Sequence, residues 1–449
     1  MTLWEFGFFN SVMHGRLTTF LIVFMALSGC KSWKAPVPVD QVDFMDRART
    51  EEHKGLRVTV GVPDRNQTKQ IFGTSLYDSR IQPVWVEVEN RTTNEYSLIK
   101  SGMDRNYYSP LEVAWKRKAG GKKTKAAMRE FFFFMDFPNP VLPGETASGF
   151  IFTDLDEGFK GVLVDLLSDH DVVSMSFVVE VPGLVTDLKQ REFKELYRDI
   201  VDIQSEDELR MILASLPAAT TDKKGENFGD PLNIAFVGDP QNIFSALIRS
   251  DWHVTEVTYA ASNWKTVKSF LFGARYLYSP ISPLYVFGRS QDLGLQRAIV
   301  QPFGQFQGRH SINTRNHMRL WMMPYRYEGY PVWLGQISRD IGVKMSKRTI
   351  VTHAIDPDVD ETRNGLVGDL AYSQALGAVA FVKGSQRSDA EDLHYNLSPD
   401  VYYSDGLRAV LFFKERPHAL DEIRLLDWEE PNRTKERMKA LQDFKARTE

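Results

Sequence analysis

The stretch LNIAFVGDP, residues 232–240, contains the change of pattern that decides the fold class. Its first six residues form a short, mostly apolar run that is typical of a buried strand. Gly238 then allows a turn, Asp239 is a good helix N-cap, and Pro240 fits the first position of a helix. Strand patterns dominate before this stretch, whereas strands and helices mix after it. We therefore predict a mixed α+β protein, with an N-terminal β-sandwich-like domain followed by a mixed α/β C-terminal domain.

The β-sandwich-like domain is expected over residues 55–185. Residues 83–89 alternate between apolar and polar side chains, so that Val84, Val86 and Val88 share one face of a strand. Strands are expected at residues 56–60, 83–89, 111–116, 147–153, 161–166 and 173–181. Short strands with turn residues between them are typical of a β-sandwich.

Two segments interrupt this strand pattern. Residues 67–72 are predicted to form a short helix. Residues 126–135 contain four consecutive phenylalanines, Phe131 to Phe134, and we expect this segment to be buried in the core.

Residues 186–228 are predicted to be a helical connector and linker. Ser205 and the acidic residues that follow it favour a helix start, and Met211 and Leu213 are expected on the apolar side of that helix. Residues 217–226 have the composition of a linker between domains.

The mixed C-terminal domain is expected over residues 229–430, followed by a charged and exposed helical tail at 431–449. Its expected strands are residues 232–237, 284–287, 316–323, 332–338, 378–383 and 407–413, and its later helices are 264–272 and 358–376.

The N-terminal stretch LIVFMALSGC, residues 21–30, ends in the single cysteine of the chain. Residues 17–26 are too short for a membrane-spanning helix and have the length of a signal-peptide core. Residues 27–30, LSGC, resemble the lipobox of bacterial lipoproteins. The resemblance implies cleavage of residues 1–29 as a signal peptide and attachment of lipid, such as palmitate, to Cys30. Residues 30–54 then form a tether, and either Met1 or Met13 is the true start.

Several acyl chains on one cysteine hold a protein on a membrane, because each buried methylene contributes roughly 0.8 kcal/mol. We therefore expect a bacterial cell-envelope protein that faces the periplasm. Lys31 stands where an inner-membrane retention signal would have aspartate, which favours the outer membrane. The chain has 55 basic and 59 acidic residues, so it has no excess of positive charge for phosphate contacts, and no nucleic-acid partner is expected.

The second half of the chain, residues 229–413, resembles the LssY-like C-terminal domain family. The segments that carry the resemblance are DPLNIAFVG (230–238), SPLYVFGRSQDLGLQ (282–296), RNHMRLW (315–321), PVWLGQISRDIGVKMSKRT (331–349), THAIDPDVDETRNGLVGDL (352–370) and YYSDGLRAVL (402–411). The resemblance implies an envelope setting near lipids or secretion and no established reaction. In some relatives this domain follows membrane segments of the DedA and lipid-phosphatase types, whereas here a lipid anchor and a β-sandwich are expected.

A first candidate ligand or metal site lies on one expected strand. His317, Arg319 and Trp321 alternate with apolar residues, so they share a face that could bind an anion or a sugar ring. The alternative is a sheet face that ordinary polar residues cap or a loop covers.

A second candidate site groups His353 with Asp356, Asp358 and Asp360, which could ligate a divalent metal or supply an acid–base pair. The alternative is a helix start, with Asp356 as the cap and Pro357 at the first helical position. Two further acids, Asp340 and Asp405, are first interpreted as turn residues and otherwise complete the site.

A basic segment with Lys344, Lys347 and Arg348 could bind a lipid headgroup or a phosphate, and the alternative is a solvated basic loop.

The chain has no phosphate loop, HExxH, GxSxG or CxxC motif. We therefore expect a binding or structural accessory with an envelope lipid, glycan or secretion-system partner. The alternative is a metal-dependent hydrolase that acts on an envelope phosphate or ester.

Overall fold

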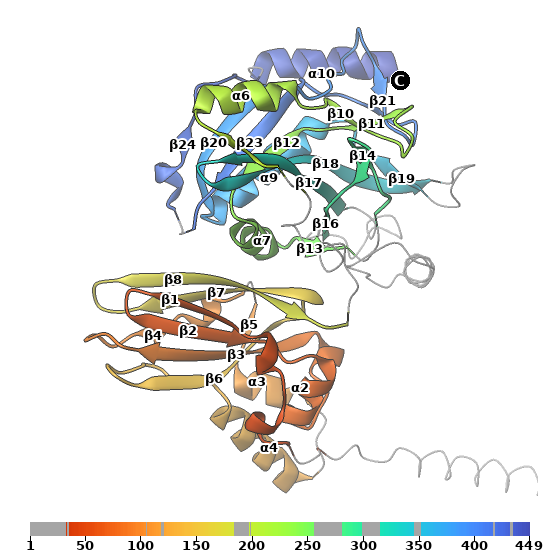
Figure 1. Ribbon diagram of the computed structural model, residues 1–449. Coiled ribbons are helices and arrows are strands. Elements are labelled where there is room, and N and C mark those ends of the chain that lie inside the picture. Colours follow the sequence, from red (N-terminus) through yellow and green to blue (C-terminus); the bar gives the residue numbers. More distant parts are fainter. Residues whose placement is uncertain are drawn as a thin grey trace, which may run out of the picture.

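A computed structural model gives the arrangement of the chain (Figure 1). It describes residues 33, 36–104, 106–117, 121–183, 197, 199–255, 281–298, 315–344, 352–415, 418–431 and 434–449, with the side chains of 343–344 and 352–353 left out. Helices and strands mix in two parts that lie one above the other, so the predicted α+β class is confirmed.

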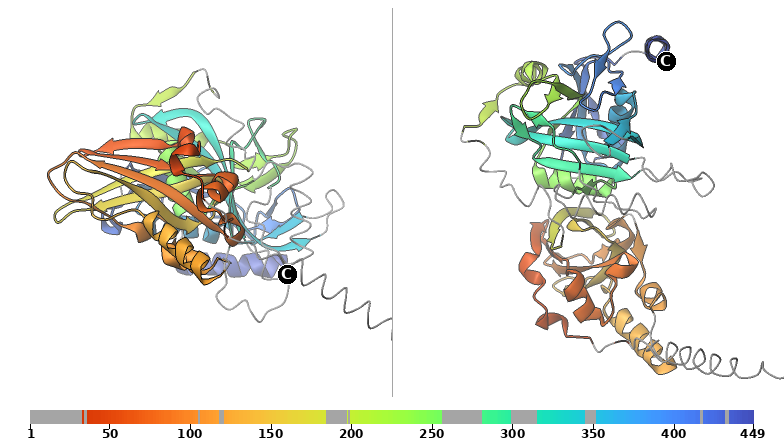
Figure 2. Two further views of the ribbon diagram at one scale, coloured as in Figure 1. Left: turned by 90° about the horizontal axis from the view of Figure 1, so that it is seen from below. Right: turned by 90° about the vertical axis from the view of Figure 1, so that its right-hand side faces the viewer.

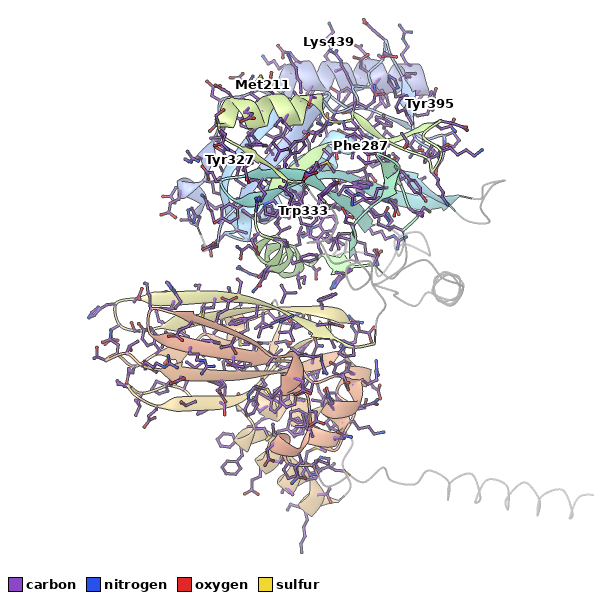
Figure 3. All side chains as sticks on the ribbon, viewed as in Figure 1. Met211, Phe287, Tyr327, Trp333, Tyr395 and Lys439 are labelled. Atoms are coloured by element: carbon purple, nitrogen blue, oxygen red, sulfur yellow. The ribbon has the colours of Figure 1, made fainter. Side chains whose placement is uncertain are left out.

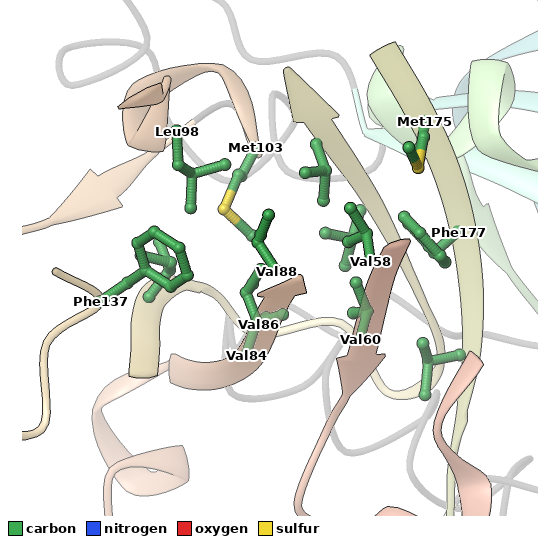
Figure 4. Packing of buried hydrophobic residues seen from close by; sticks show 14 of the residues in the cluster. Val58, Val60, Val84, Val86, Val88, Leu98, Met103, Phe137, Met175 and Phe177 are labelled. Carbon is green, nitrogen blue, oxygen red and sulfur yellow. The ribbon is translucent and has the colours of Figure 1, made fainter. Parts of the chain in front are cut away.

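The N-terminal part contains two packed sheets. One has the strand order β1 (Arg49–His53), β2 (Leu56–Gly61), β3 (Ile81–Asn90), β6 (Thr146–Asp154) and β5 (Tyr107–Tyr108). The other has the order β4 (Ser97–Leu98), β7 (Gly158–Leu167) and β8 (Val172–Val181). Alternate residues such as Val58, Val86 and Phe177 fill the space between the sheets (Figure 4). The strand alternation in the sequence therefore predicted this sandwich correctly. The expected tether at 30–54 is wrong for its described part, because Phe44 is buried and β1 pairs with β2 in the sandwich.

Helices cover the outer face of the five-stranded sheet. They are α2 (Arg65–Phe72), α3 (Pro110–Trp115) and α4 (Lys122–Phe134). The predicted strand at 111–116 is wrong, because Ser109 caps α3 and Pro110 starts it.

The four phenylalanines of α4 are not all buried, which corrects the prediction for residues 126–135. Phe132 packs against Phe72 and Phe152, whereas Phe133 and Phe134 are exposed. Consecutive residues of a helix point about 100° apart, so one apolar face cannot take all four rings.

A large sheet forms the centre of the C-terminal part (Figure 1). Its strand order is β13 (His253–Val254), β16 (Leu293–Ala298), β17 (Arg315–Tyr327), β18 (Tyr330–Lys344), β12 (Ile234–Val237), β23 (Leu407–Phe413), β20 (Leu376–Lys383) and β24 (Arg424–Leu425). In addition β19 (Thr352–Ile355) pairs with β18, and β9 (Val201–Ile203) pairs with β17.

Both faces of this sheet are covered. One apolar core lies under α7 (Pro240–Arg249) and α9 (Val359–Tyr372), and another lies under α6 (Glu206–Ser215). Smaller strands add to the second face, namely β10 (Ala219–Thr221), β11 (Phe228–Pro231), β14 (Tyr285–Val286), β15 (Arg289–Ser290), β21 (His394–Tyr395) and β22 (Val401–Tyr402). The predicted start of α7 is confirmed, since Asp239 accepts a hydrogen bond from the Gln241 N–H.

Three expectations for this part are corrected by the structure. Met211 lies on the exposed side of α6 (Figure 3). The expected linker contains β10, which pairs with β11 and β14 and so belongs to the C-terminal part. The tail helix α10 (Thr434–Thr448) is not wholly exposed, because Phe444 is buried and its ring centroid lies 5.8 Å from that of Tyr403.

The two parts meet where α7 packs on β7 and β8. His253 of the C-terminal part lies 3.3 Å from Asp156 of the N-terminal part, and Lys160 contacts both Asp156 and Asp104. We call Asp104, Asp156, Lys160, Asp251 and His253 the interface charge cluster. Burial alone would lower the pKa of His253, but its hydrogen bonds to Asp156 and Asp251 outweigh burial and raise the pKa to about 9.

Candidate functional site

The hairpin of β17 and β18 places polar side chains opposite one another. A two-residue turn at Glu328 and Gly329, both with positive φ, joins the strands. A β-bulge follows, and beyond it the register pairs Arg315 with Asp340, His317 with Ser338, and Arg319 with Gln336. On the other side of β17, Gln296 of β16 pairs with His317. We call Gln296, Arg315, His317, Arg319, Gln336, Ser338 and Asp340 the polar row.

Strand alternation explains why these residues gather on one face. Met318, Leu320 and Met322 point into the core under α7, so the residues between them point to the other side of the sheet. The predicted shared face of His317, Arg319 and Trp321 therefore agrees with the structure.

This face is not open to solvent. His317, Arg319 and Trp321 are all buried. The backbone of Ser282 lies over Arg319, and Trp321 donates to the Arg289 carbonyl at 3.1 Å. The structure therefore agrees with the alternative of a covered sheet face.

Neutral acceptors hold the buried guanidinium of Arg319. It donates to the Gln336 side-chain oxygen at 2.8 Å and to the Ser282 carbonyl at 3.1 and 3.2 Å. The carboxylate of Asp230 in β11 is 3.9 Å away, which is beyond hydrogen-bond distance. Asp230 Oδ1 is buried and has no hydrogen-bond partner among the described residues. This pair of charges is thus close but incompletely satisfied.

The other end of the polar row joins two basic side chains to one acid. Asp340 Oδ2 lies 3.2 Å from His317 Nδ1 and 3.4 Å from Arg315 Nε. Arg315 also donates to the Gln296 side-chain oxygen at 2.8 Å. Asp340, first interpreted as a turn residue, is therefore a strand residue that completes the first candidate site.

Burial disfavours the charged form of every ionisable group whose pKa is shifted here. It raises the pKa of Asp340 to about 7, although Arg315 and Arg319 act in the opposite direction. It also raises the pKa of Asp230, and it lowers the pKa values of Arg315 and Arg319. Arginine keeps its proton in proteins, whereas a carboxyl with such a pKa is partly neutral near pH 7. The row therefore carries two buried guanidinium groups, whose charge Asp340 and the neighbouring Asp230 compensate only in part.

The acids of the second candidate site have a different environment. Asp358 is the N-cap of α9, accepting from the Glu361 N–H at 3.1 Å, and it binds Arg437 of α10 at 2.6 Å. Asp356 accepts from the Asp358 N–H at 3.1 Å in a local turn. The helix-start interpretation is thus correct, but the cap is Asp358 and not Asp356, so Pro357 precedes the helix.

Two further acids are bound by Arg363, which is fully buried in α9. The two terminal guanidinium nitrogens donate to Asp405, at 2.7 and 3.0 Å, and Asp360 lies 3.3 Å from one of them. Burial raises the pKa of Asp360, and Arg363 opposes that rise. Among the residues that the structure describes, no group of three or more His, Cys, Asp or Glu side chains is placed to hold a metal ion.

Several predicted residues lie outside this description. Cys30, Lys347, Arg348 and the expected helix at 264–272 are not among the described residues. His353 lies in β19, opposite Val343, and Lys344 lies in β18, opposite Thr352, but the side chains of both are outside the description.

Sequence reasoning missed Arg315, Gln336 and Asp230. Arg315 stands two residues before His317 and Gln336 lies among alternating apolar residues, so continuing the two-residue period along both strands would have found them. Asp230 lies near Arg319 only because the fold brings β11 close to β17, and no pattern in the neighbouring sequence predicts this contact.

None of the helices in the described part of the chain has both the length and the apolar character that crossing a membrane requires.

Residues 213–407 match the family model described as LssY C-terminus. The C-terminal part therefore contains an LssY-like C-terminal domain, which confirms the resemblance found in the sequence. The match runs from α6 to the first residue of β23, and it includes the polar row and Arg363 with its acidic partners Asp360 and Asp405. The chain matches no curated protein.

Proposed function

We propose that this protein is a lipid-anchored binding accessory of the bacterial cell envelope, and that its LssY-like C-terminal domain binds an anionic group at the polar row. The observation that carries the proposal is the buried guanidinium of Arg319, which neutral acceptors hold while Asp230 stays 3.9 Å away. An anion of the ligand would complete the compensation that Asp230 gives this charge only in part.

The chemistry of the row suits a phosphate or carboxylate. Guanidinium groups bind such anions through paired N–H donors. Arg315 and Arg319 lie on the same face of β17, one two residues before His317 and the other two residues after it. Arg315 is slightly less buried than Arg319, with 14% against 8% of the side chain exposed. An envelope lipid headgroup, an acidic glycan or a partner in secretion would present such an anion.

The proposed location rests on the lipobox-like residues 27–30. Lipid on Cys30 would hold the protein on the periplasmic side of a membrane, with the outer membrane favoured by Lys31. The described structure begins at Trp33, so the anchor would join the fold through a very short connection.

A second candidate function is hydrolysis of an envelope phosphate or ester. The contact of 3.2 Å between His317 and Asp340 favours it, because a histidine and a carboxyl at this distance can act as a general acid–base pair. In this alternative, His353 is one of the ligands of a divalent metal ion.

Native mass spectrometry of residues 31–449, produced in a bacterial periplasm, tests the anionic ligand. We expect a copurified mass of a phosphate- or carboxylate-bearing molecule, lost in Arg319→Gln and in Arg315→Gln. Arg326→Gln is the matched control, because Arg326 lies on the same strand but is exposed and paired with Asp202. Circular dichroism verifies that each variant folds.

An adduct that persists in both polar-row variants contradicts this binding site, as does a protein mass that stays unliganded with envelope extract. A bound metal ion that disappears in His353→Ala would instead support the hydrolase.

Replacing Cys30 by alanine tests the proposed anchor. We expect the full-length chain to fractionate with the outer membrane and to carry acyl chains on its N-terminal peptide. Cys30→Ala should lose the acyl mass completely and remain an uncleaved precursor. A wild-type N-terminal peptide without lipid would rule out the anchor.

A further inference from the structure

We infer that helices α3 and α4 form a membrane-binding surface, in which exposed aromatic rings enter the headgroup region of a phospholipid bilayer and neighbouring basic residues bind anionic headgroups. We call this the α3–α4 surface, made of Trp115, Phe133, Phe134, Lys116, Lys122, Lys123, Lys125 and Arg129. The inference rests on the proposed function for the orientation of the protein at a membrane, but its own evidence comes from these residues.

The aromatic side chains of this surface are unusually open to solvent. Trp115, Phe133 and Phe134 are 74%, 59% and 73% exposed. Phe133 and Phe134 touch edge to face with ring centroids 5.7 Å apart. A cluster of large apolar side chains exposed on a protein surface marks an interaction site, whereas a single exposed apolar side chain needs no explanation.

Helix geometry explains why these rings point outward. Met128 and Phe132, four residues apart, anchor α4 to the N-terminal part. Phe133 and Phe134 follow at the next two positions and turn away from that contact. Arg129, one turn before Phe133, lies 4.9 Å above the Trp115 ring and so links α4 to α3.

The surface is strongly basic within a chain of net charge −4. Residues 110–134 contain seven lysines and arginines and only two acids, Glu112 and Glu130. Glu112 pairs with Lys116 at 2.6 Å, which leaves most of this positive charge without an acidic neighbour in the segment. Basic residues around exposed aromatic rings are the pattern of a protein face that lies in the interface of an anionic membrane.

The position of the N-terminus favours a bilayer as the occupant. Trp33 donates to the Phe72 carbonyl at 2.7 Å, and its ring centroid lies 5.6 Å from that of Phe131 in α4. Cys30 is three residues earlier, and an extended chain of that length spans at most about 10 Å. A lipid anchor at Cys30 would therefore hold α4 at the membrane.

The overall arrangement agrees with this orientation. Figures 1 and 2 show α4 at the end of the N-terminal part that lies farthest from the C-terminal part. A membrane that contacts α4 would leave the C-terminal part, which contains the polar row, on the side away from the bilayer.

Vesicle co-sedimentation of residues 31–449 tests the surface without any anchor, and this fragment contains every described residue. We expect binding to vesicles that contain phosphatidylglycerol, weak binding to pure phosphatidylcholine, and loss of binding at high salt. Phe133→Ser with Phe134→Ser should weaken binding at least tenfold. Phe228→Ser with Phe287→Ser is the matched control, because each of these phenylalanines is 68% exposed in the C-terminal part.

The basic residues are tested by a triple variant, Lys122→Glu with Lys123→Glu and Lys125→Glu. Each lysine near an anionic surface contributes about fivefold to binding, so the triple variant should lose about a hundredfold. Lys435→Glu with Lys439→Glu, two exposed residues of helix α10, should leave binding unchanged.

The inference is overturned if the fragment does not bind anionic vesicles, or if both α3–α4 variants bind as tightly as their controls. Self-association that Phe133→Ser with Phe134→Ser abolishes, without vesicle binding, would make a second copy the occupant instead. Neither result bears on the Cys30 experiment, which reports lipidation in the cell, so failure of the surface and failure of the anchor are distinguishable.

Discussion

Replacement of Arg363 by methionine is expected to lower the free energy of unfolding by about 3–5 kcal/mol, because it leaves buried carboxylates without compensation. Arg363 is fully buried and binds Asp405 through two hydrogen bonds. It also lies 3.3 Å from Asp360 and donates to the Leu407 carbonyl at 2.8 Å. This one side chain therefore connects α9 to the start of β23. Urea unfolding followed by circular dichroism measures the effect.

The matched control is Arg387→Met, since Arg387 also pairs with an acid, Asp389, but is 76% exposed. An exposed ion pair contributes about 0–1 kcal/mol, so this variant should be close to wild type. Adding Asp360→Asn and Asp405→Asn to Arg363→Met should recover part of the loss, because the uncompensated charges are then removed. A loss below about 1 kcal/mol in Arg363→Met would contradict a structural role for the acid cluster.

The pH dependence of the Arg363→Met variant follows from the same argument. Burial already raises the pKa of Asp360, and loss of Arg363 removes the main group that opposes this rise. Protonation of the acids in acidic solution should therefore reduce the difference between variant and wild type.

His253 is expected to make the stability of the protein fall as the solution becomes alkaline. Its pKa in the folded state is raised to about 9, above the value of about 6.5 for an unperturbed histidine. The folded state therefore binds the proton more tightly than the unfolded state. This stabilisation is fully present below about pH 6.5 and is lost as the pH rises through about 9.

The expected size of this effect is about 3 kcal/mol, since one pKa unit corresponds to about 1.4 kcal/mol. Urea unfolding at pH 6.5 and at pH 9.5 should show this loss in the wild type and little of it in His253→Gln. His394→Gln is the control, because the acid beside His394 is the exposed Asp392 and neither residue belongs to the interface charge cluster. Parallel pH profiles of wild type and His253→Gln would show that the cluster does not couple the two parts.

The sequence predicted best those elements whose signal is local. The alternation of residues 83–89 correctly predicted β3, and Asp239 with Pro240 correctly predicted the start of α7. The strand prediction at 111–116 failed although Ser109 and Pro110 form a good helix start, because alternating side chains were given more weight than the cap.

For the candidate sites too, the sequence predicted local features and missed contacts with distant segments. The two-residue period correctly placed His317 and Arg319 on one face, but it could not show that Ser282 and β11 cover that face. The acids after His353 were recognised as a helix start, yet their main partners Arg363 and Arg437 were not considered. Arg363 lies one helical turn from Asp360, so that pair was within reach of a spacing argument, whereas Arg437 is far away in the sequence.

The sequence by itself determined the class of the fold, most of its strands and helix starts, and the LssY-like character of its second half, because these depend on residues that are near one another in the chain. The tertiary structure decided which of those residues are buried, which acids meet which arginines, and which aromatic rings remain in solvent. Burial and ion pairing depend on segments that approach from distant positions, and the free energy of a charge depends on that surrounding rather than on its neighbours in sequence.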